Sequence, residues 1–234
     1  MYIQFSVSIS GVLLPRLTSM VAKNNSAKEI SDIFIKTGRI QCIVISFVLS
    51  GFIVFGQSFI DVWAGQNYHE SFVITLIFFT ALFIPLIQNT GIIILQARNQ
   101  MKFRSLLYLA ISIISLAGQV ILAKKMGAIG CAISIGGALI VGQGIIMNIY
   151  YARIQKIDIP YFWNNIIKML IMPIFFTSIS YIIVNRYHFN DFMTLTIAII
   201  IFSAIYIPCL WKFSINKYER NLFSAPIIKI RRSM

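Results

Sequence analysis

The 234-residue chain is too apolar for a soluble domain, since 58% of its residues are hydrophobic and 12% are charged, against about 25% charged residues in soluble domains. Its mean hydropathy of +0.82 points the same way. The net charge of +13 does not indicate nucleic-acid binding, because the basic residues lie between apolar runs rather than on one face of a soluble fold. We therefore predict an integral membrane protein with no nucleic-acid partner.

Seven apolar runs follow one another along the chain, each close to the roughly 20 residues that cross a hydrocarbon core of about 30 Å. They do not alternate between apolar and polar residues as membrane strands do, so helices are expected. We predict one all-α transmembrane domain over residues 1–234. Its last part, 212–234, is a basic cytoplasmic tail. Its spans lie at about 2–21, 40–60, 72–96, 105–123, 127–149, 166–184 and 192–211.

The first span contains Arg16 directly after Pro15. A long basic side chain near a span end reaches the lipid head groups at low cost, so Arg16 is either an anchor or a contact for a substrate phosphate. In the segment 22–39 that follows, Ser26 and Glu29 match a capping box that opens a helix. We expect a short helix on the membrane surface there, with a mobile gate between spans as the alternative.

The third span carries a polar stripe, since Pro85, Asn89 and Gln96 fall within about 20° of a common direction on an ideal helix. These side chains either bond neighbouring helices or line a cavity, and the same two alternatives hold for Gln119 and Gln143. The fifth span instead has a ladder of small residues, which predicts close helix packing. The ladder consists of Gly130, Ser134, Ala138 and Gly142.

The basic residues outside the spans predict the orientation of the chain. Sixteen of them fall in the first, third and fifth loops and the tail, and three fall in the other loops. We therefore predict a cytoplasmic C-terminus and an N-terminus on the outside. Because a first span that enters from outside with nothing before it is unusual, we expect that further helices normally precede it.

The sequence gives little indication of a catalytic or metal-binding site. His69 and His188 lie far apart in outer loops without metal-ligand spacing, no predicted span has a carboxylate at mid-depth, and phosphate-loop and zinc motifs are absent. The three cysteines fall inside predicted spans, where thiols act as small apolar groups. We expect neither an enzyme nor a cofactor or metal site.

Four stretches in order resemble the polysaccharide flippases, which export O-antigen and capsule repeat units and belong with the multidrug exporters to one superfamily. "VLLPRLTSMVAKNN" leads through a basic stretch to "KTGRI" at the next span, and "GFIVFGQSFIDVWAGQNYHES" closes that span. "FIPLIQNTGIIILQARNQMKF" is similar to the family's proline-containing helix, and "KKMGAIGCAIS" to the loop that opens the following one. The resemblance covers about residues 1–150, and the last two spans only by topology.

The resemblance implies that the chain is the C-terminal lobe of a twelve- to fourteen-helix transporter in the bacterial inner membrane. It implies flipping of undecaprenyl-linked oligosaccharides by alternating access, with the missing N-terminal lobe, membrane lipids and the polysaccharide polymerase machinery as partners. A polar cavity would receive the sugar-phosphate head while the prenyl tail stays in lipid. The expected cavity residues are Arg16, Asn89, Gln96, Gln119 and Gln143.

Three alternatives remain on the sequence alone. The first is an exporter of drugs or of another lipid-linked substrate from the same superfamily. The second is a complete seven-helix receptor, which shares the predicted orientation but has no receptor-type motif in its inner turns. The third is a membrane-embedded polymerase or acyltransferase, a class that normally needs charged or histidine residues at membrane depth.

Overall fold

The computed structural model describes residues 2–23, 25–187, 189 and 191–222. Every regular element assigned within these residues is a helix, as the sequence predicts. His188 and the tail residues Lys229, Arg231 and Arg232 lie outside the described residues.

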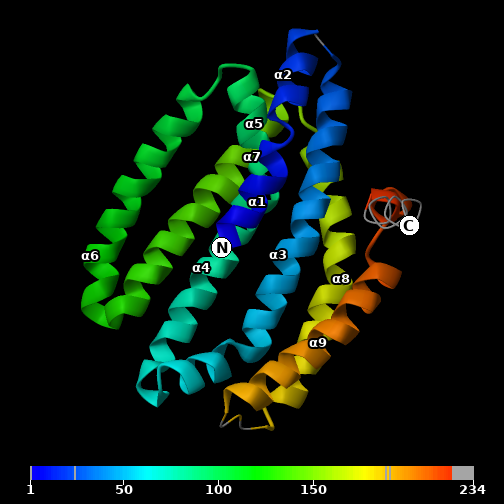
Figure 1. Ribbon diagram of the computed structural model, residues 1–234. Coiled ribbons are helices and arrows are strands. Elements are labelled where there is room, and N and C mark those ends of the chain that lie inside the picture. The colour runs from blue at the N-terminus through cyan, green and yellow to red at the C-terminus, as the bar shows by residue number, and fades with distance from the viewer. Residues whose placement is uncertain (1, 24, 188, 190, 223–234) are drawn as a thin grey trace.

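The helices run up and down in one bundle (Figure 1). Their order along the chain is α1 (Tyr2–Gly11), α2 (Leu14–Ala22), α3 (Ala27–Trp63), the 3₁₀ turn η1 (Gln66–Tyr68), α4 (His69–Ile87), α5 (Asn89–Ala97), α6 (Lys102–Leu139), the π-helical segment η2 (Ile140–Ile146), α7 (Met147–Arg153), α8 (Ile159–Val184) and α9 (Phe192–Phe213).

Five helical stretches in the described part of the chain are long and apolar enough to cross a membrane. They are Ala27–Trp63, His69–Ile87, Lys102–Arg153, Ile159–Val184 and Phe192–Phe213. The pair α1 and α2, bent by 41°, is a sixth candidate. The chain is therefore a multi-pass membrane protein, and this count differs from the predicted seven spans because it takes Lys102–Arg153 as one helix.

The predicted first span, 2–21, consists of two helices because of Pro15. In a continuous helix the Pro15 ring would clash with the carbonyl group of Gly11, and α1 ends at Gly11. Pro15 instead lies in the first turn of α2, where a missing N–H costs nothing. Arg16 follows it on an exposed face of α2.

α3 extends well beyond the predicted span 40–60. Its 37 residues reach about 55 Å at 1.5 Å per residue. The predicted helix start is confirmed, since Ser26 Oγ accepts a hydrogen bond from the Glu29 N–H at 3.3 Å. The predicted separate surface helix over 22–39 is wrong, because most of that segment is the first part of α3. Its apolar face is buried by protein, with the Phe34 ring 4.9 Å from that of Phe162.

The stretch Lys102–Arg153 turns back on itself at Gly127. This residue has φ 57° and ψ −136°, which is outside the helical range, and Figure 1 shows the chain descending before it and ascending after it. Ser134 Oγ donates to the Ser115 carbonyl at 2.8 Å across the two arms. The predicted close packing of the small-residue ladder is confirmed, because a Cβ atom on Gly130 or Gly142 would collide with the arm before the turn, at Leu122 and Ile111.

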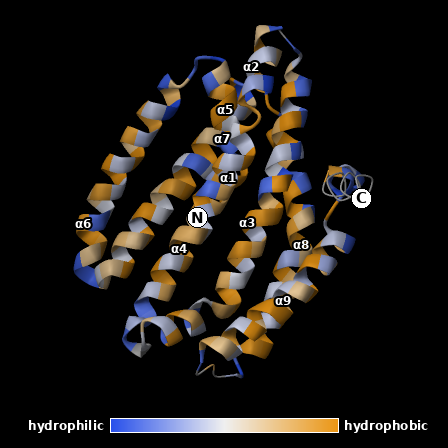
Figure 2. Ribbon diagram, in the orientation of Figure 1, coloured by the Kyte–Doolittle hydropathy of each residue, from blue (hydrophilic) through white to orange (hydrophobic). Residues whose placement is uncertain are grey.

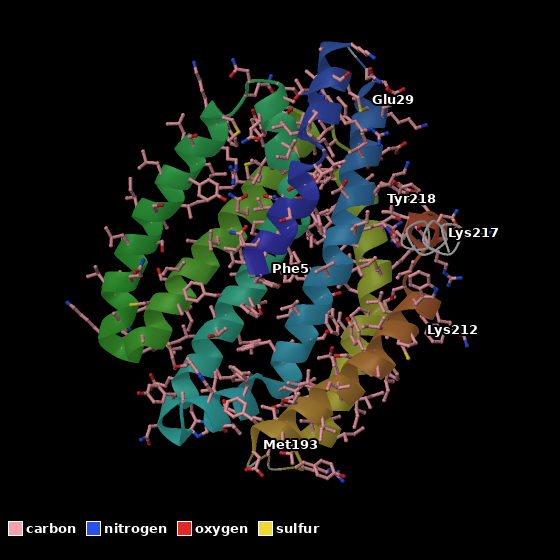
Figure 3. All side chains as sticks on the ribbon, viewed as in Figure 1. Phe5, Glu29, Met193, Lys212, Lys217 and Tyr218 are labelled. Carbon is pink, nitrogen blue, oxygen red and sulfur yellow. The ribbon has the colours of Figure 1, made fainter. Side chains whose placement is uncertain are left out.

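The first, third and fifth predicted loops, which contain ten basic residues, gather at one end of the bundle, which we name the basic end. The α2–α3, α5–α6 and α7–α8 junctions lie there, whereas the α3–α4 and α8–α9 junctions and the Gly127 turn lie at the other end (Figure 1). Hydrophilic residues concentrate at both ends and apolar ones between them (Figure 2). In Figure 3, Glu29 lies at the basic end and Met193 at the opposite end.

Candidate functional site

A groove of about 690 Å³ opens between α4 and α8, with residues of α3 also lining it. Its lining comes from four elements that are distant in the sequence, because α4 and α8 both pack along α3. The lining residues are Ser46, Leu49, Ser50 and Ile53 of α3, Thr80, Phe83 and Ile84 of α4, Ile140 of η2, and Trp163, Leu170, Pro173, Ile174, Thr177, Ser178, Tyr181 and Ile182 of α8.

The polar atoms of this groove are few, and most belong to hydroxyl groups. Thr80 and Ser178 donate to carbonyl groups of their own helices at 2.8 Å, and Ser46 does so at 3.2 Å. Thr177 is 7% exposed, and its Oγ1 has no hydrogen-bond partner. A buried hydroxyl without a partner costs free energy. The Thr177 oxygen is itself covered by protein atoms, so a ligand would reach it only after a movement of α8.

No charged side chain is among the described residues that line the groove. Aliphatic and aromatic groups supply most of its surface, and several are exposed at its rim, with Ile174 62% and Ile182 60% accessible. Such a cleft is suited to an apolar chain or an amphiphilic molecule. It offers no cation to balance a phosphate group.

The wall formed by α8 is one continuous helix that contains Pro173, which lines the groove. Because proline has no N–H, the carbonyl group of Met169 loses its partner within the helix. Ser214 Oγ, from the segment after α9, donates to this carbonyl oxygen at 3.1 Å. The residues after α9 therefore stabilise α8 at the position where one helical hydrogen bond is missing.

A first buried polar cluster lies where α4 ends and α5 begins, around Gln88. The Leu86 carbonyl accepts the hydroxyl of Ser6 at 2.5 Å. Gln41 Nε2 donates to both Ser6 oxygens at 3.1 Å, and Asn89 Nδ2 donates to Ser10 Oγ at 2.5 Å. The Ser6 hydroxyl of α1 thus pairs a backbone carbonyl beside the interruption, as membrane depth requires, and Gln41 of α3 holds Ser6 in place.

A second cluster links this interruption to the groove. Gln88 Nε2 donates to Asn148 Oδ1 at 2.8 Å, and the indole N–H of Trp163 donates to the same oxygen at 3.1 Å. Trp163 also lines the groove. Asn148 Oδ1 therefore joins the α4–α5 junction to a residue that lines the groove.

The five residues predicted to line a cavity are not brought together. Asn89 belongs to the first cluster, and Gln143 is buried in η2, where its Nε2 has no hydrogen-bond partner. Gln119 donates to Ser115 Oγ at 3.1 Å within α6. Arg16 and Gln96 are exposed. None of the five is among the residues that line the groove.

Comparison with protein-family models, with curated proteins and with solved structures gives no match to this chain.

The sequence patterns considered above did not indicate the groove residues of α8, although their spacing along the helix is regular. Pro173, Thr177 and Tyr181 stand at intervals of four, which places them on one helical face. Ser46 and Ser50 repeat that interval in α3.

Proposed function

We propose that this chain is part of a transporter that moves an undecaprenyl-linked oligosaccharide across the bacterial inner membrane. The observation that carries the proposal is the groove between α4 and α8, set beside an interrupted helix at Gln88. Grooves beside discontinuous helices are typical of transport proteins. The resemblance of residues 1–150 to polysaccharide flippases supports the choice of substrate.

Within this proposal the chain crosses the membrane seven times. The arms on either side of Gly127 are counted as two spans, because the chain reverses there, and α1 with α2 forms the first. The gathering of basic loops at one end supports a cytoplasmic location for that end, since cytoplasmic loops are rich in lysine and arginine. The chain would then form the C-terminal lobe of the transporter.

We assign the groove to the apolar part of the substrate. Its lining is uncharged among the described residues and its rim is aliphatic, so a prenyl chain fits it better than a diphosphate. The Thr177 hydroxyl would meet a polar atom near the head of the lipid. This assignment replaces the expectation of a polar cavity for the sugar-phosphate head in this part of the chain.

Translocation would then follow alternating access, in which two groups of helices rock around a site between them. The interrupted helix at Gln88 allows α4 and α5 to tilt separately, and Asn148 connects that junction to Trp163 in the groove. No bond in the substrate is made or broken, so the proposed activity is transport rather than catalysis.

Export of an amphiphilic drug is the second candidate, and the same groove supports it. A mostly apolar cleft of about 690 Å³ is in the range of small-molecule sites, about 300–1,000 Å³. Ethidium accumulation in cells separates the two candidates, because a drug exporter lowers it and an oligosaccharide flippase leaves it unchanged.

The proposal is tested by measuring the export of surface polysaccharide in cells whose export depends on this protein. Each variant is made in the full-length protein that the gene encodes. Thr177→Val removes the free hydroxyl at nearly constant volume and is expected to lower export. Thr196→Val is the matched control, because Thr196 is exposed on α9, outside the groove. Normal export by the Thr177→Val protein, at normal abundance, would remove Thr177 from the site.

A further inference from the structure

Arg39 and Glu219 form a buried ion pair between residues 180 positions apart in the sequence. Arg39 Nε lies 2.5 Å from Glu219 Oε1, and Arg39 Nη2 lies 3.1 Å from Oε2, so the contact uses both carboxylate oxygens. The Arg39 side chain is 9% exposed and the Glu219 side chain 1%. Paired contacts of this kind fix orientation as well as charge.

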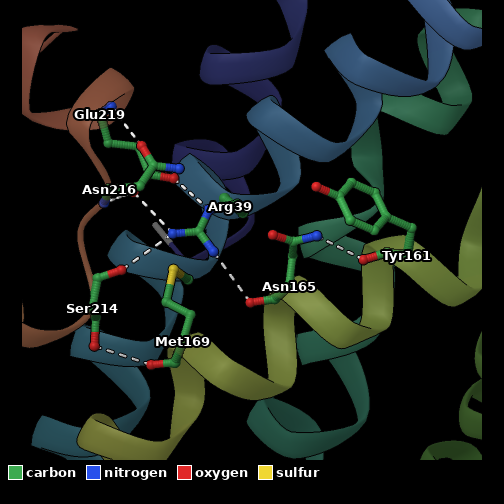
Figure 4. Close-up of polar contacts among 7 residues, drawn as sticks. All are labelled: Arg39, Tyr161, Asn165, Met169, Ser214, Asn216 and Glu219. Atoms are coloured by element: carbon green, nitrogen blue, oxygen red, sulfur yellow. Dashed lines mark hydrogen bonds and ion pairs between the residues drawn. The ribbon is translucent and has the colours of Figure 1, made fainter.

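The remaining donors of Arg39 bind two other segments of the chain (Figure 4). Nη1 donates to the carbonyl of Asn165 in α8 at 3.2 Å, and Nη2 donates to the carbonyl of Ser214 after α9 at 3.1 Å. One guanidinium on α3 therefore holds α8 and the C-terminal segment together.

The C-terminal segment is ordered around this contact by its own hydrogen bonds. The Asn216 N–H donates to Glu219 Oε2, and the Glu219 N–H donates to Asn216 Oδ1, both at 2.9 Å. Lys36 Nζ lies 5.2 Å from the centre of the Tyr218 ring, so α3 contacts the segment a second time. These contacts place the Glu219 carboxylate against Arg39.

The same segment reaches the groove wall. Ser214 accepts from Arg39 through its carbonyl oxygen and donates through its hydroxyl to the carbonyl of Met169, at 3.1 Å. Met169 is the residue whose carbonyl group Pro173 leaves without a helical partner. The chain of contacts Arg39, Ser214, Met169 and Pro173 thus runs from α3 to the groove.

We propose that residues 214–219 form a latch that holds α8 against α3, at the carbonyl that Pro173 leaves without a helical partner, and thereby sets the width of the groove. Arg39, Ser214 and Glu219 are its positioning residues. The latch is inferred from the contacts of Arg39, Ser214 and Glu219 alone. Its importance for transport rests on the proposed function of the groove. Opening the latch frees α8 at Pro173 and leaves the groove without a fixed wall.

The test measures the distance across the groove in membrane-reconstituted protein. Spin labels are attached at Thr80→Cys on α4 and Ser178→Cys on α8, two exposed lining residues. Cys131→Ala and Cys209→Ala remove the partly accessible thiols, and Cys42 stays because it is buried. Pulsed electron-spin resonance then gives the distribution of label distances.

With the latch intact, we expect one narrow peak in the distribution of label distances. In Glu219→Gln we expect a broad distribution in place of that peak. Ser214→Ala should broaden the peak less, because the ion pair remains. Lys217→Gln is the matched control, since Lys217 is exposed in the same segment and appears beside Tyr218 in Figure 3. It should leave the peak unchanged.

The double variant Arg39→Gln with Glu219→Gln keeps the test decisive if the single variant folds poorly, because it leaves no unpaired buried charge. It should fold and still give a broad distribution. An unchanged narrow peak in both Glu219→Gln and the double variant overturns the latch. A broad distribution together with normal polysaccharide export supports the latch and rejects the groove as the transport site.

Discussion

Gly38 lies at a close contact of α3 with its neighbours. A Cβ atom there would come within 2.8 Å of the Ile87 carbonyl oxygen and 2.5 Å of the Phe162 ring. Backbone cannot move away as a flexible side chain can, so overpacking of this kind costs about 1–3 kcal/mol. We predict that Gly38→Ala lowers the apparent melting temperature of the detergent-solubilised protein.

Gly51 provides the matched control for that change, because it lies in the same helix and a Cβ atom there would meet nothing within 4 Å. Alanine in an open helical position is favourable by about 0.5–1 kcal/mol relative to glycine. Gly51→Ala should therefore leave the melting temperature equal or higher. Equal melting temperatures for Gly38→Ala and Gly51→Ala would show that the contact at Gly38 relaxes freely.

At the scale of single residues, the buried pair Arg39 and Glu219 leads to a second prediction about stability. Removing one partner of a buried pair costs about 3–5 kcal/mol, whereas replacing both partners often costs much less. Glu219→Gln should therefore destabilise the protein more than the double change Arg39→Gln with Glu219→Gln. Thermal unfolding of the four members of this cycle measures the difference, and simple additivity would contradict the pairing.

At the scale of elements, the sequence located interruptions better than it located helix ends. Pro85 removes one backbone hydrogen bond from the third span, and the helix breaks at Gln88, three residues later. The length of α3 was not predicted, because the charged residues Lys36 and Arg39 indicated a loop before the span that was predicted to begin at residue 40. Both residues are accommodated by contacts with the C-terminal segment, which local sequence does not reveal.

The turn at Gly127 leads to a prediction of its own. Its φ of 57° with ψ of −136° suits glycine, and a side chain in such a conformation costs about 1–3 kcal/mol. Gly127→Ala should lower the apparent melting temperature. Gly137→Ala, at an open helical position of the same element, should not, and a similar fall in both proteins would mean that the turn tolerates a side chain.

At the scale of the whole molecule, the proposed orientation predicts which ends react with reagents outside the cell. Lys124→Cys, beside the Gly127 turn, should react with a membrane-impermeant maleimide in intact cells, and Gln100→Cys at the basic end should react only after the membrane is opened. The reverse pattern would invert the orientation. Equal reaction at both positions in intact cells would contradict a membrane crossing between them.

The sequence by itself determined the membrane class, the helical fold and most of the apolar segments, because hydropathy and helix-breaking residues act locally. Only the tertiary structure decided which polar groups share a site. Asn89 and Gln96 share a helix, yet one is buried against Ser10 and the other is exposed. The groove and the Arg39–Glu219 pair join segments distant in the chain, and such contacts follow from packing geometry rather than from local pattern.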